Sequence, residues 1–256
     1  MPLAASIVRQ TRLQPADREA MLALHARHFG NVQRERFLAD LAGKDWVIVL
    51  RALDGTIVGF STQVLITLTV QGRPLRFLFS GDTVVDHAHW RSPALAGSFG
   101  HLMLRLLALH GEDGLYWFLI TKGYRTYRFL PVFFRSFYPT YAAETPAATG
   151  ALLEAVAAHR FGATYDRRTG LIRPGAGADW LLPELAHVPA ARRRDAHVAF
   201  FLQRNPGFAS GDELACLAAI RRDNLTSQAW RVIRTTQPNW DPGETGPEPG
   251  APAGTP

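Results

Sequence analysis

The chain has 256 residues, a net charge of +6 and a pI near 10. Its hydrophobic content of 47% is enough for a buried core, and no apolar run is long enough to span a bilayer. The N-terminal residues lack the basic and apolar regions of a secretory signal, and the single cysteine, Cys216, excludes an intrachain disulfide. We therefore expect a cytoplasmic globular protein whose positive charge suits an anionic partner.

The first part of the chain alternates helical and extended patterns. A Pro-Ala-Asp start predicts a helix from Pro15, and a second helix is expected around residues 33–41. Asp54-Gly55 supplies the positive φ of a tight hairpin turn, and a second turn is expected at 71–74. β-Branched and aromatic residues predict strands at residues 7–9, 46–50, 57–70 and 77–85.

The stretch that follows the fourth of these strands is the most informative one. A polar, aromatic elbow covers residues 86–91, and Ser92-Pro93 then opens a helix, because Ser is a favoured N-cap and Pro fits the first helical position. Gly97 and Gly100 would let this helix approach a neighbouring element closely. A strand that feeds a helix through a short elbow presents free amides and the positive end of the helix dipole, which suits a phosphate group.

The second part of the chain begins with an apolar strand at 115–120 and a helix at 121–131 that Pro131 is expected to end. A helix is predicted at 147–159, short strands within 161–174, a helix at 190–203 and a last strand at 230–233. Pro, Gly, Thr and Glu dominate from Pro238 onward, which predicts a disordered tail at 238–256.

The segment Arg91-Ser92-Pro93-Ala94-Leu95-Ala96 resembles the (Gln/Arg)-x-x-(Gly/Ala)-x-(Gly/Ala) loop of the GNAT superfamily of acyl-CoA N-acyltransferases. The predicted order β-α-α-β-β-β-α-β-α over residues 7–131 is also the order of that superfamily. The resemblance implies an α/β fold with a mixed, mostly antiparallel sheet flanked by helices, and with a C-terminal extension. We assign residues 1–141 to the acyl-CoA-binding core and 142–237 to a part that completes the fold and the acceptor site.

The same resemblance implies the contacts of the acyl donor. The loop amides would hold the pyrophosphate of coenzyme A, and exposed backbone of the preceding strand would pair with the pantetheine arm in a gap between two splayed strands. The cofactor-binding residues implied are Val84, Val85, Arg91, Ser92, Ala94, Leu95 and Ala96. The resemblance implies acyl-CoA, or an acyl-phosphopantetheine, as a co-substrate, and no prosthetic group or metal site is predicted.

Catalytic candidates lie on either side of this loop. Asp82 would lie near the reacting centre and accept a proton directly or through water, although it equally fits a polar residue that bonds a neighbouring strand. His87 and His89 are alternative bases that also fit an elbow surface. Tyr127 resembles the tyrosine that protonates the departing thiolate in many GNAT enzymes, and Tyr124, one helical turn earlier, is the alternative.

The predicted function is transfer of an acyl group from acyl-CoA to an amine by direct attack in a ternary complex. The aromatic residues at 129–141 either join the two halves of the core or line a pocket for a longer acyl chain. That second interpretation leaves open a fatty-acyl transferase that lipidates a peptide or an amino acid, with acyl-CoA or acyl carrier protein as donor. A non-catalytic acyl-CoA-binding module is a further alternative, and a nucleic-acid partner is disfavoured because no recognisable motif is present.

Overall fold

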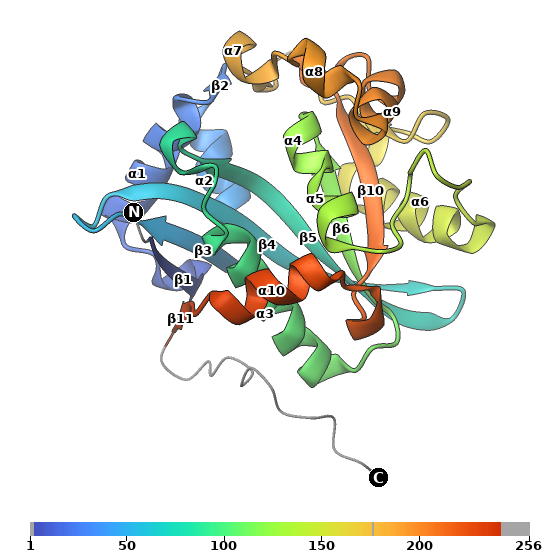
Figure 1. Cartoon of the computed structure of the whole chain (residues 1–256), viewed down its shortest axis with the longest axis horizontal. Coiled ribbons are helices and arrows are strands. Elements are labelled where there is room, and N and C mark those ends of the chain that lie inside the picture. The colour runs from blue at the N-terminus through green and yellow to red at the C-terminus, as the bar shows by residue number, and fades with distance from the viewer. Residues whose placement is uncertain (1–2, 176, 242–256) are drawn as a thin grey trace.

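A mixed sheet forms the centre of the protein (Figure 1), and the computed structural model describes residues 3–175 and 177–241. Within these residues nine strands hydrogen-bond side by side in the order β11-β1-β3-β4-β5-β6-β10-β8-β7. The β5–β6 and β1–β11 pairs are parallel, and the other pairs are antiparallel. In chain order the strands are β1 (Ala4–Arg9), β3 (Trp46–Arg51), β4 (Ile57–Val70), β5 (Arg73–Val85), β6 (Leu115–Thr121), β7 (Tyr165–Asp166), β8 (Leu171–Ile172), β10 (Glu213–Ala219) and β11 (Asn239–Trp240).

Helices cover both faces of this sheet, and a short pair of strands lies outside it. That pair is formed by β2 (Phe29–Gly30) and β9 (Trp180–Leu181). The helices are α1 (Pro15–Ala26), α2 (Arg34–Ala42), α3 (Ala94–His110), α4 (Tyr124–Tyr127), α5 (Phe129–Phe133), α6 (Ala147–Phe161), α7 (Pro183–Ala186), α8 (Ala190–Arg193), α9 (Ala196–Arg204) and α10 (Ser227–Thr235).

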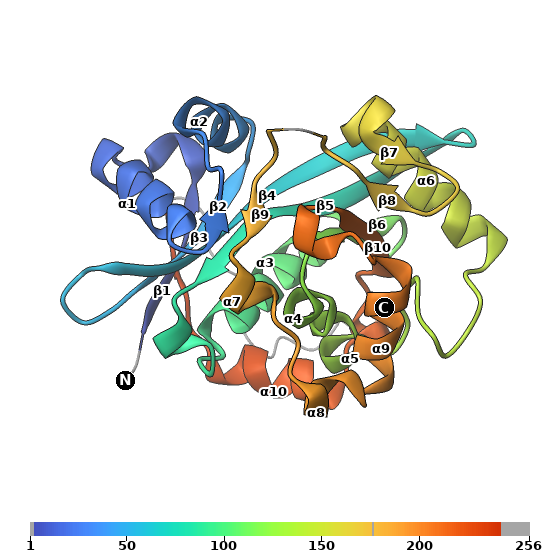
Figure 2. The ribbon, with the colours of Figure 1, turned by 90° about the horizontal axis from the view of Figure 1, so that it is seen from above.

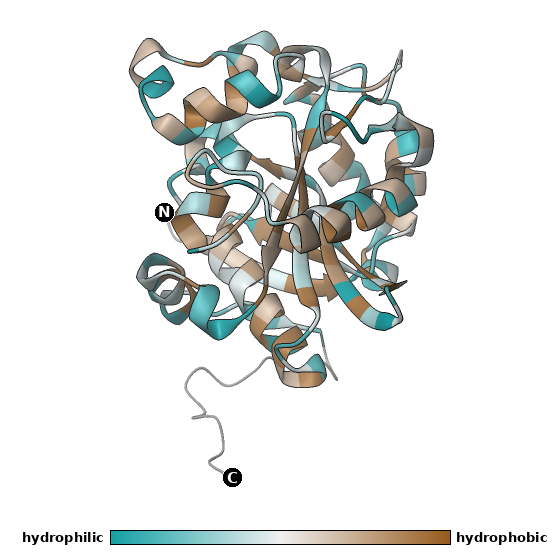
Figure 3. Ribbon diagram, turned by 90° about the vertical axis from the view of Figure 1, so that its right-hand side faces the viewer, coloured by the Kyte–Doolittle hydropathy of each residue, from teal (hydrophilic) through white to brown (hydrophobic). Residues whose placement is uncertain are grey.

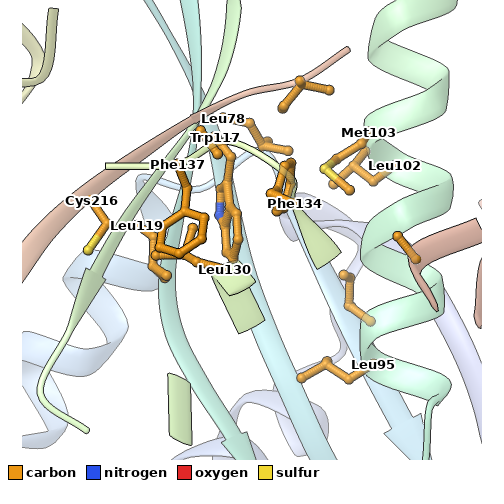
Figure 4. Close-up of a cluster of buried hydrophobic side chains, with 14 of the residues drawn as sticks. Leu78, Leu95, Leu102, Met103, Trp117, Leu119, Leu130, Phe134, Phe137 and Cys216 are labelled. Atoms are coloured by element: carbon orange, nitrogen blue, oxygen red, sulfur yellow. The ribbon is translucent and has the colours of Figure 1, made fainter. Parts of the chain in front are cut away.

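Alternating side chains of the strands build separate cores on the two faces, because successive residues of a strand point to opposite sides. Leu78 and Trp117 pack with α3, α5, α9 and α10 on one face, and Figure 4 shows Trp117 against Phe134 and the side chains of α3. Phe77 and Phe118 face the other side and pack with α6, while α1 and α2 cover β3 and β4 on that side. Figure 3 shows the apolar residues concentrated in these central strands.

The architecture confirms the predicted fold class, including the element order over residues 7–131. Several details are wrong. The single helix predicted at 190–203 is divided into α8 and α9, because Asp195 caps a new helix by accepting from the His197 and Val198 amides. Pro131 does not end a helix but lies in the first turn of α5, where a missing N–H costs no intrahelical bond. Residues 230–233 form part of α10 and not a strand, because Thr226 caps this helix by accepting from the Ala229 amide and because residues 229, 232 and 233 bury one helical face.

The C-terminal part shares the sheet of the N-terminal part, since β10 lies between β6 and β8. The division at residue 141 stays a prediction. The tail prediction is wrong at its start, because Asn239–Trp240 pairs with β1 as β11. Its remainder, residues 242–256, lies outside the described residues. No helix in the described part of the chain is both long and apolar enough to cross a bilayer.

Close contact between α3 and α10 confirms the role predicted for the two glycines of α3. A Cβ atom on Gly97 would lie 2.0 Å from Thr236 Oγ1, and one on Gly100 would lie 2.3 Å from Ile233 Cγ1. Only a residue without a side chain fits at either position. These contacts fix the C-terminal helix against the helix that begins at the elbow (Figure 1).

We therefore expect Gly97→Ala to lower the free energy of unfolding by about 1–3 kcal/mol, the usual effect of overpacking a core. Gly150→Ala is the matched control in α6, because its Cβ would meet only Thr145 Cγ2, at 3.8 Å. That change should be neutral or stabilise by up to about 1 kcal/mol, since Ala favours a helix over Gly. Urea denaturation measures both, and equal stability of the two variants would contradict the packing argument.

Candidate active site

A bulge in β5 opens the sheet at its centre. The parallel pairing of β5 with β6 runs from Arg76 opposite Leu115 to Ser80 opposite Leu119 and then stops. The antiparallel pairing of β4 with β5 shifts register at the same level, which places Gly81 and Asp82 together opposite one residue of β4. A bulge of this kind bends its strand. Beyond the bulge β5 separates from β6, and a cavity of about 640 Å³ lies in the gap between them and extends past it on both sides.

A chain of buried hydrogen bonds fixes the strands around the bulge. Trp117 Nε1 donates to Ser80 Oγ at 2.9 Å, and Ser80 Oγ donates to Gln63 Oε1 at 2.8 Å. Gln63 Nε2 donates to Ser61 Oγ at 2.7 Å, and Ser61 shares a 2.7 Å hydrogen bond with Thr83. Because each of these polar groups has a partner, the network is stabilising and holds β4, β5 and β6 in one arrangement.

The elbow and the start of α3 form one end of the cavity. Val84, Val85, Ser92, Leu95 and Ala96 all line it. The helix begins at Ala94, one residue later than the sequence predicts. Ser92 Oγ accepts a hydrogen bond from the Ala94 amide at 3.3 Å.

Two of the predicted loop residues lie off the lining of this cavity: Ala94 is buried, and Arg91 is exposed. Of the two elbow histidines, His89 lines the cavity, whereas His87 packs edge-on against Trp90. The backbone of the loop nevertheless runs along the cavity end.

A cluster of charged side chains forms the middle of the cavity. Asp179 accepts from Lys122 Nζ at 2.7 Å and lies 3.0 Å from His25 Nε2. Lys122 Nζ is also 3.5 Å from a carboxylate oxygen of Glu213. Asp82 lines the same space, and its carboxyl group makes no hydrogen bond or ion pair with any residue in the described ranges.

The pKa values of these groups are shifted in different directions. Burial raises the pKa of Asp82 and of Glu213. Burial would also raise the pKa of Asp179, but its bonds to His25 and Lys122 dominate together and hold that pKa well below the ordinary value. Burial lowers the pKa of Lys122, and Glu213 and Asp179 more than reverse this effect. Asp179 and Lys122 therefore form a charged pair at neutral pH, and Asp82 remains a stronger base than an exposed carboxylate.

The two predicted tyrosines differ in position. Tyr127 is fully buried among Phe137, Phe200 and Phe201, and its hydroxyl donates to the Pro139 carbonyl at 2.9 Å. Burial raises the pKa of this hydroxyl far above its ordinary value. Tyr127 does not line the cavity, whereas Tyr124 does.

Four residues of the charged cluster were not predicted as site residues: His25, Lys122, Asp179 and Glu213. They come from α1, the end of β6, the segment before β9 and the start of β10. Lys122 carried the only local signal, a single charge directly after an apolar strand. Over residues 3–175 and 177–241, no group of three or more His, Cys, Asp or Glu side chains is placed to hold a metal ion.

We predict that Asp179→Asn lowers the free energy of unfolding by about 3 kcal/mol at about pH 7, because it leaves Lys122 buried with one fewer partner. Since the folded-state pKa of Asp179 is depressed, its contribution is present above the unfolded value of about 3.9 and is lost as the pH falls. The stability difference between wild type and variant should therefore shrink below about pH 4.

Denaturation of both proteins across this pH range tests the prediction. Asp113→Asn is the control, since that side chain is 92% exposed. A pH-independent difference between Asp179→Asn and wild type would contradict it.

Comparison with protein-family models and with curated proteins finds no match to this chain. Among solved structures, a probable N-acyltransferase from Enterococcus faecalis matches with a TM-score of 0.39 and 15% identity, over 54% of this chain and 33% of its own. The GNAT-family N-acetyltransferase YhbS from Escherichia coli, solved with CoA, matches with a TM-score of 0.31 and 21% identity, over 48% and 64% of the two chains. Saccharomyces cerevisiae N-myristoyltransferase with bound myristoyl-CoA gives 0.35 and 17%, over 48% and 32%.

This chain thus spans about a third of the length of the Enterococcus and yeast proteins that it matches. The topology of this chain identifies its fold more directly than these partial matches do. The element order, the separation of β5 from β6 beyond Ser80, and the elbow that leads into α3 are those that the sequence resemblance implies. The chain has a GNAT-like fold.

Proposed function

We propose that the protein is an acyl-CoA-dependent N-acyltransferase in which an amine attacks the thioester directly. The observation that carries this proposal is one continuous cavity between the splayed strands. It joins the backbone at the start of α3, which suits a phosphate, to the carboxyl group of Asp82, which has no partner among residues 3–175 and 177–241. A donor thioester and an acceptor amine can therefore meet in one space.

Backbone groups would hold the donor. The first amides of α3 lack intrahelical partners and suit the pyrophosphate of coenzyme A. Beyond Ser80, the edge of β5 that faces β6 has no partner strand in the described residues, while its other edge stays paired with β4 through Val84 and Val85. An extended pantetheine arm can pair with such an edge as an added strand does.

Asp82 is the proposed general base. The ammonium form of the acceptor first loses a proton to Asp82, directly or through water, which frees the lone pair of its nitrogen. The neutral nitrogen then attacks the thioester carbon, the C–N bond forms and the C–S bond breaks. The second proton that the nitrogen gives up balances the one that the general acid delivers to the thiolate. The raised pKa of Asp82 supports this role because a base works best when its pKa is near the working pH.

Tyr124 is the proposed general acid that returns a proton to the departing thiolate. It lies at the first position of α4 and lines the cavity near the end of β6. Tyr127, the first choice from the sequence, lies with its hydroxyl bonded to Pro139 in the core, and this position favours a role in packing. A hydroxyl group must reach the sulfur to protonate it, so the geometry supports Tyr124.

A short acyl group fits this arrangement best. A second, apolar cavity of about 50 Å³ shares Thr83, Leu95 and Ala96 with the first cavity, and Phe133 and Phe134 lie in its wall. Its small volume suits an acetyl or similarly short group. Phe137 lines neither cavity. Transfer of fatty-acyl groups and donation by an acyl carrier protein stay predictions of the sequence.

With acetyl-CoA and a panel of amines, Tyr124→Phe should lower kcat by about 10²–10⁴-fold and leave CoA binding intact, since only the acidic hydroxyl is removed. Thiol release measures turnover. Tyr127→Phe is the matched control, which should keep kcat and lose about 1 kcal/mol of stability with its hydrogen bond.

The reverse result, with Tyr127→Phe inactive but folded and Tyr124→Phe active, would return the acid role to Tyr127. Tight acetyl-CoA binding without turnover on any amine would support a non-catalytic binding module instead.

A further inference from the structure

A short segment that precedes α7 forms part of the cavity wall. We call residues 177–182 the strap. Figure 2 looks down on this segment, in which β9 lies beside β2 and leads into α7. Asn31 Nδ2 donates to the Ala178 carbonyl and Arg36 Nη1 to the Gly177 carbonyl, both at 3.1 Å. These bonds, together with the β2–β9 pairing, tie the strap to the N-terminal helices.

Lys122, which donates to Asp179, ties the strap to the other side of the gap at the end of β6. The cavity is therefore bounded by residues from both sides and from the strap between them. A space bounded in this way suits a small acceptor molecule.

The inner part of the cavity carries an excess of carboxyl groups. Asp82, Asp179 and Glu213 face one lysine, Lys122, and one imidazole, His25. Asp179 uses both of these partners, Glu213 has only the 3.5 Å contact with Lys122, and Asp82 has no partner in the described parts of the chain. A buried excess of carboxyl groups attracts an ammonium group, which is the resting form of an amine substrate.

The outer part of the cavity carries an excess of cations. The Arg160 guanidinium lines it, lies 5.5 Å from the centre of the Phe79 ring and pairs with Asp40 at 2.9 Å. Asp40 also pairs with Lys44, a buried side chain that does not line the cavity. Arg36, one turn earlier on α2, lines the same end of the cavity. Arg36 and Arg160 thus outnumber the one carboxylate, Asp40, at this end of the cavity. Phe79 precedes Asp82 by three residues on β5, so the two charged regions lie on neighbouring stretches of one strand.

We propose, building on the function above, that the acceptor is a small primary amine that also carries an anionic group, a carboxylate or a phosphate. Its ammonium group lies at Asp82 and Glu213, and its anionic group lies at Arg36 and Arg160. Arginine suits this role because its planar guanidinium binds carboxylate and phosphate through paired hydrogen bonds. The spacing of the two regions favours a short chain between the two charges.

Matched amines that differ in the anionic group test this proposal. With acetyl-CoA as donor, kcat/KM is compared for γ-aminobutyrate and butylamine, for glycine and methylamine, and for O-phosphoethanolamine and ethanolamine. We expect the anionic member of at least one pair to be preferred by about 10-fold or more, the usual effect of a charged hydrogen bond. The carboxylate and phosphate pairs distinguish the two kinds of anion.

Arg160→Met and Arg36→Met should each lower that preference by about 10-fold, measured as the ratio of kcat/KM for the anionic member to kcat/KM for the neutral member. Arg167→Met is the control, because Arg167 pairs with Glu154 at 2.7 Å and does not line the cavity. A thermal unfolding scan shows whether each variant folds. If one arginine variant fails to fold, the other variant and the wild-type ratios decide the outcome.

Equal rates for the anionic and neutral members of every pair would overturn this inference and leave the acyltransferase proposal standing. Transfer to a peptide amine but to none of these small amines would do the same. Absence of acyl transfer to any amine would overturn the function itself and this inference with it.

Discussion

The site depends on one constraint, the bulge at Gly81 and Asp82 that ends the pairing of β5 with β6. A continuous parallel pair would close the sheet and leave no space at its centre. Glycine is needed here because a Cβ on Gly81 would lie 2.8 Å from Lys44 Cε and 2.7 Å from Thr62 Oγ1. The chain of hydrogen bonds that begins at Trp117 and ends at Thr83 holds β4, β5 and β6 in place around the bulge. The gap is therefore fixed by the structure of the sheet.

The gap that the bulge opens is lined by charged side chains. Asp82 and Lys122 come from the two separated strands, and the strap adds Asp179, which accepts from Lys122. Because Asp179 is held by two partners, it fixes the strap, whereas Asp82 stays free to react. One carboxylate of the cluster is therefore structural, and another is available for the proton transfer that we propose.

Local patterns were sufficient to predict much of this fold. β-Branched, aromatic and other apolar residues located β3 to β6, and the Asp54-Gly55 turn set the first hairpin. Residues 230–233 were misread because their β-branched content concealed a helical face that only packing against α3 reveals.

The charged cluster could not be predicted for a related reason. His25 and Asp179 are separated by 154 positions, and nothing near either residue shows that they meet. Tyr127 and Tyr124 share one short helix, so the sequence alone could not show which of them lines the cavity.

The central claim is that the elbow and the start of α3 hold the phosphates of coenzyme A. Calorimetric titration of coenzyme A into wild type, Ser92→Asp and Ser92→Asn tests it most directly. Both side chains can still accept from the Ala94 amide, but only Asp adds a negative charge. Our account predicts near wild-type affinity for Ser92→Asn and affinity about 10-fold or more weaker for Ser92→Asp, because like charges repel at close range. Equal affinity in the two variants, or no binding to wild type, would contradict it.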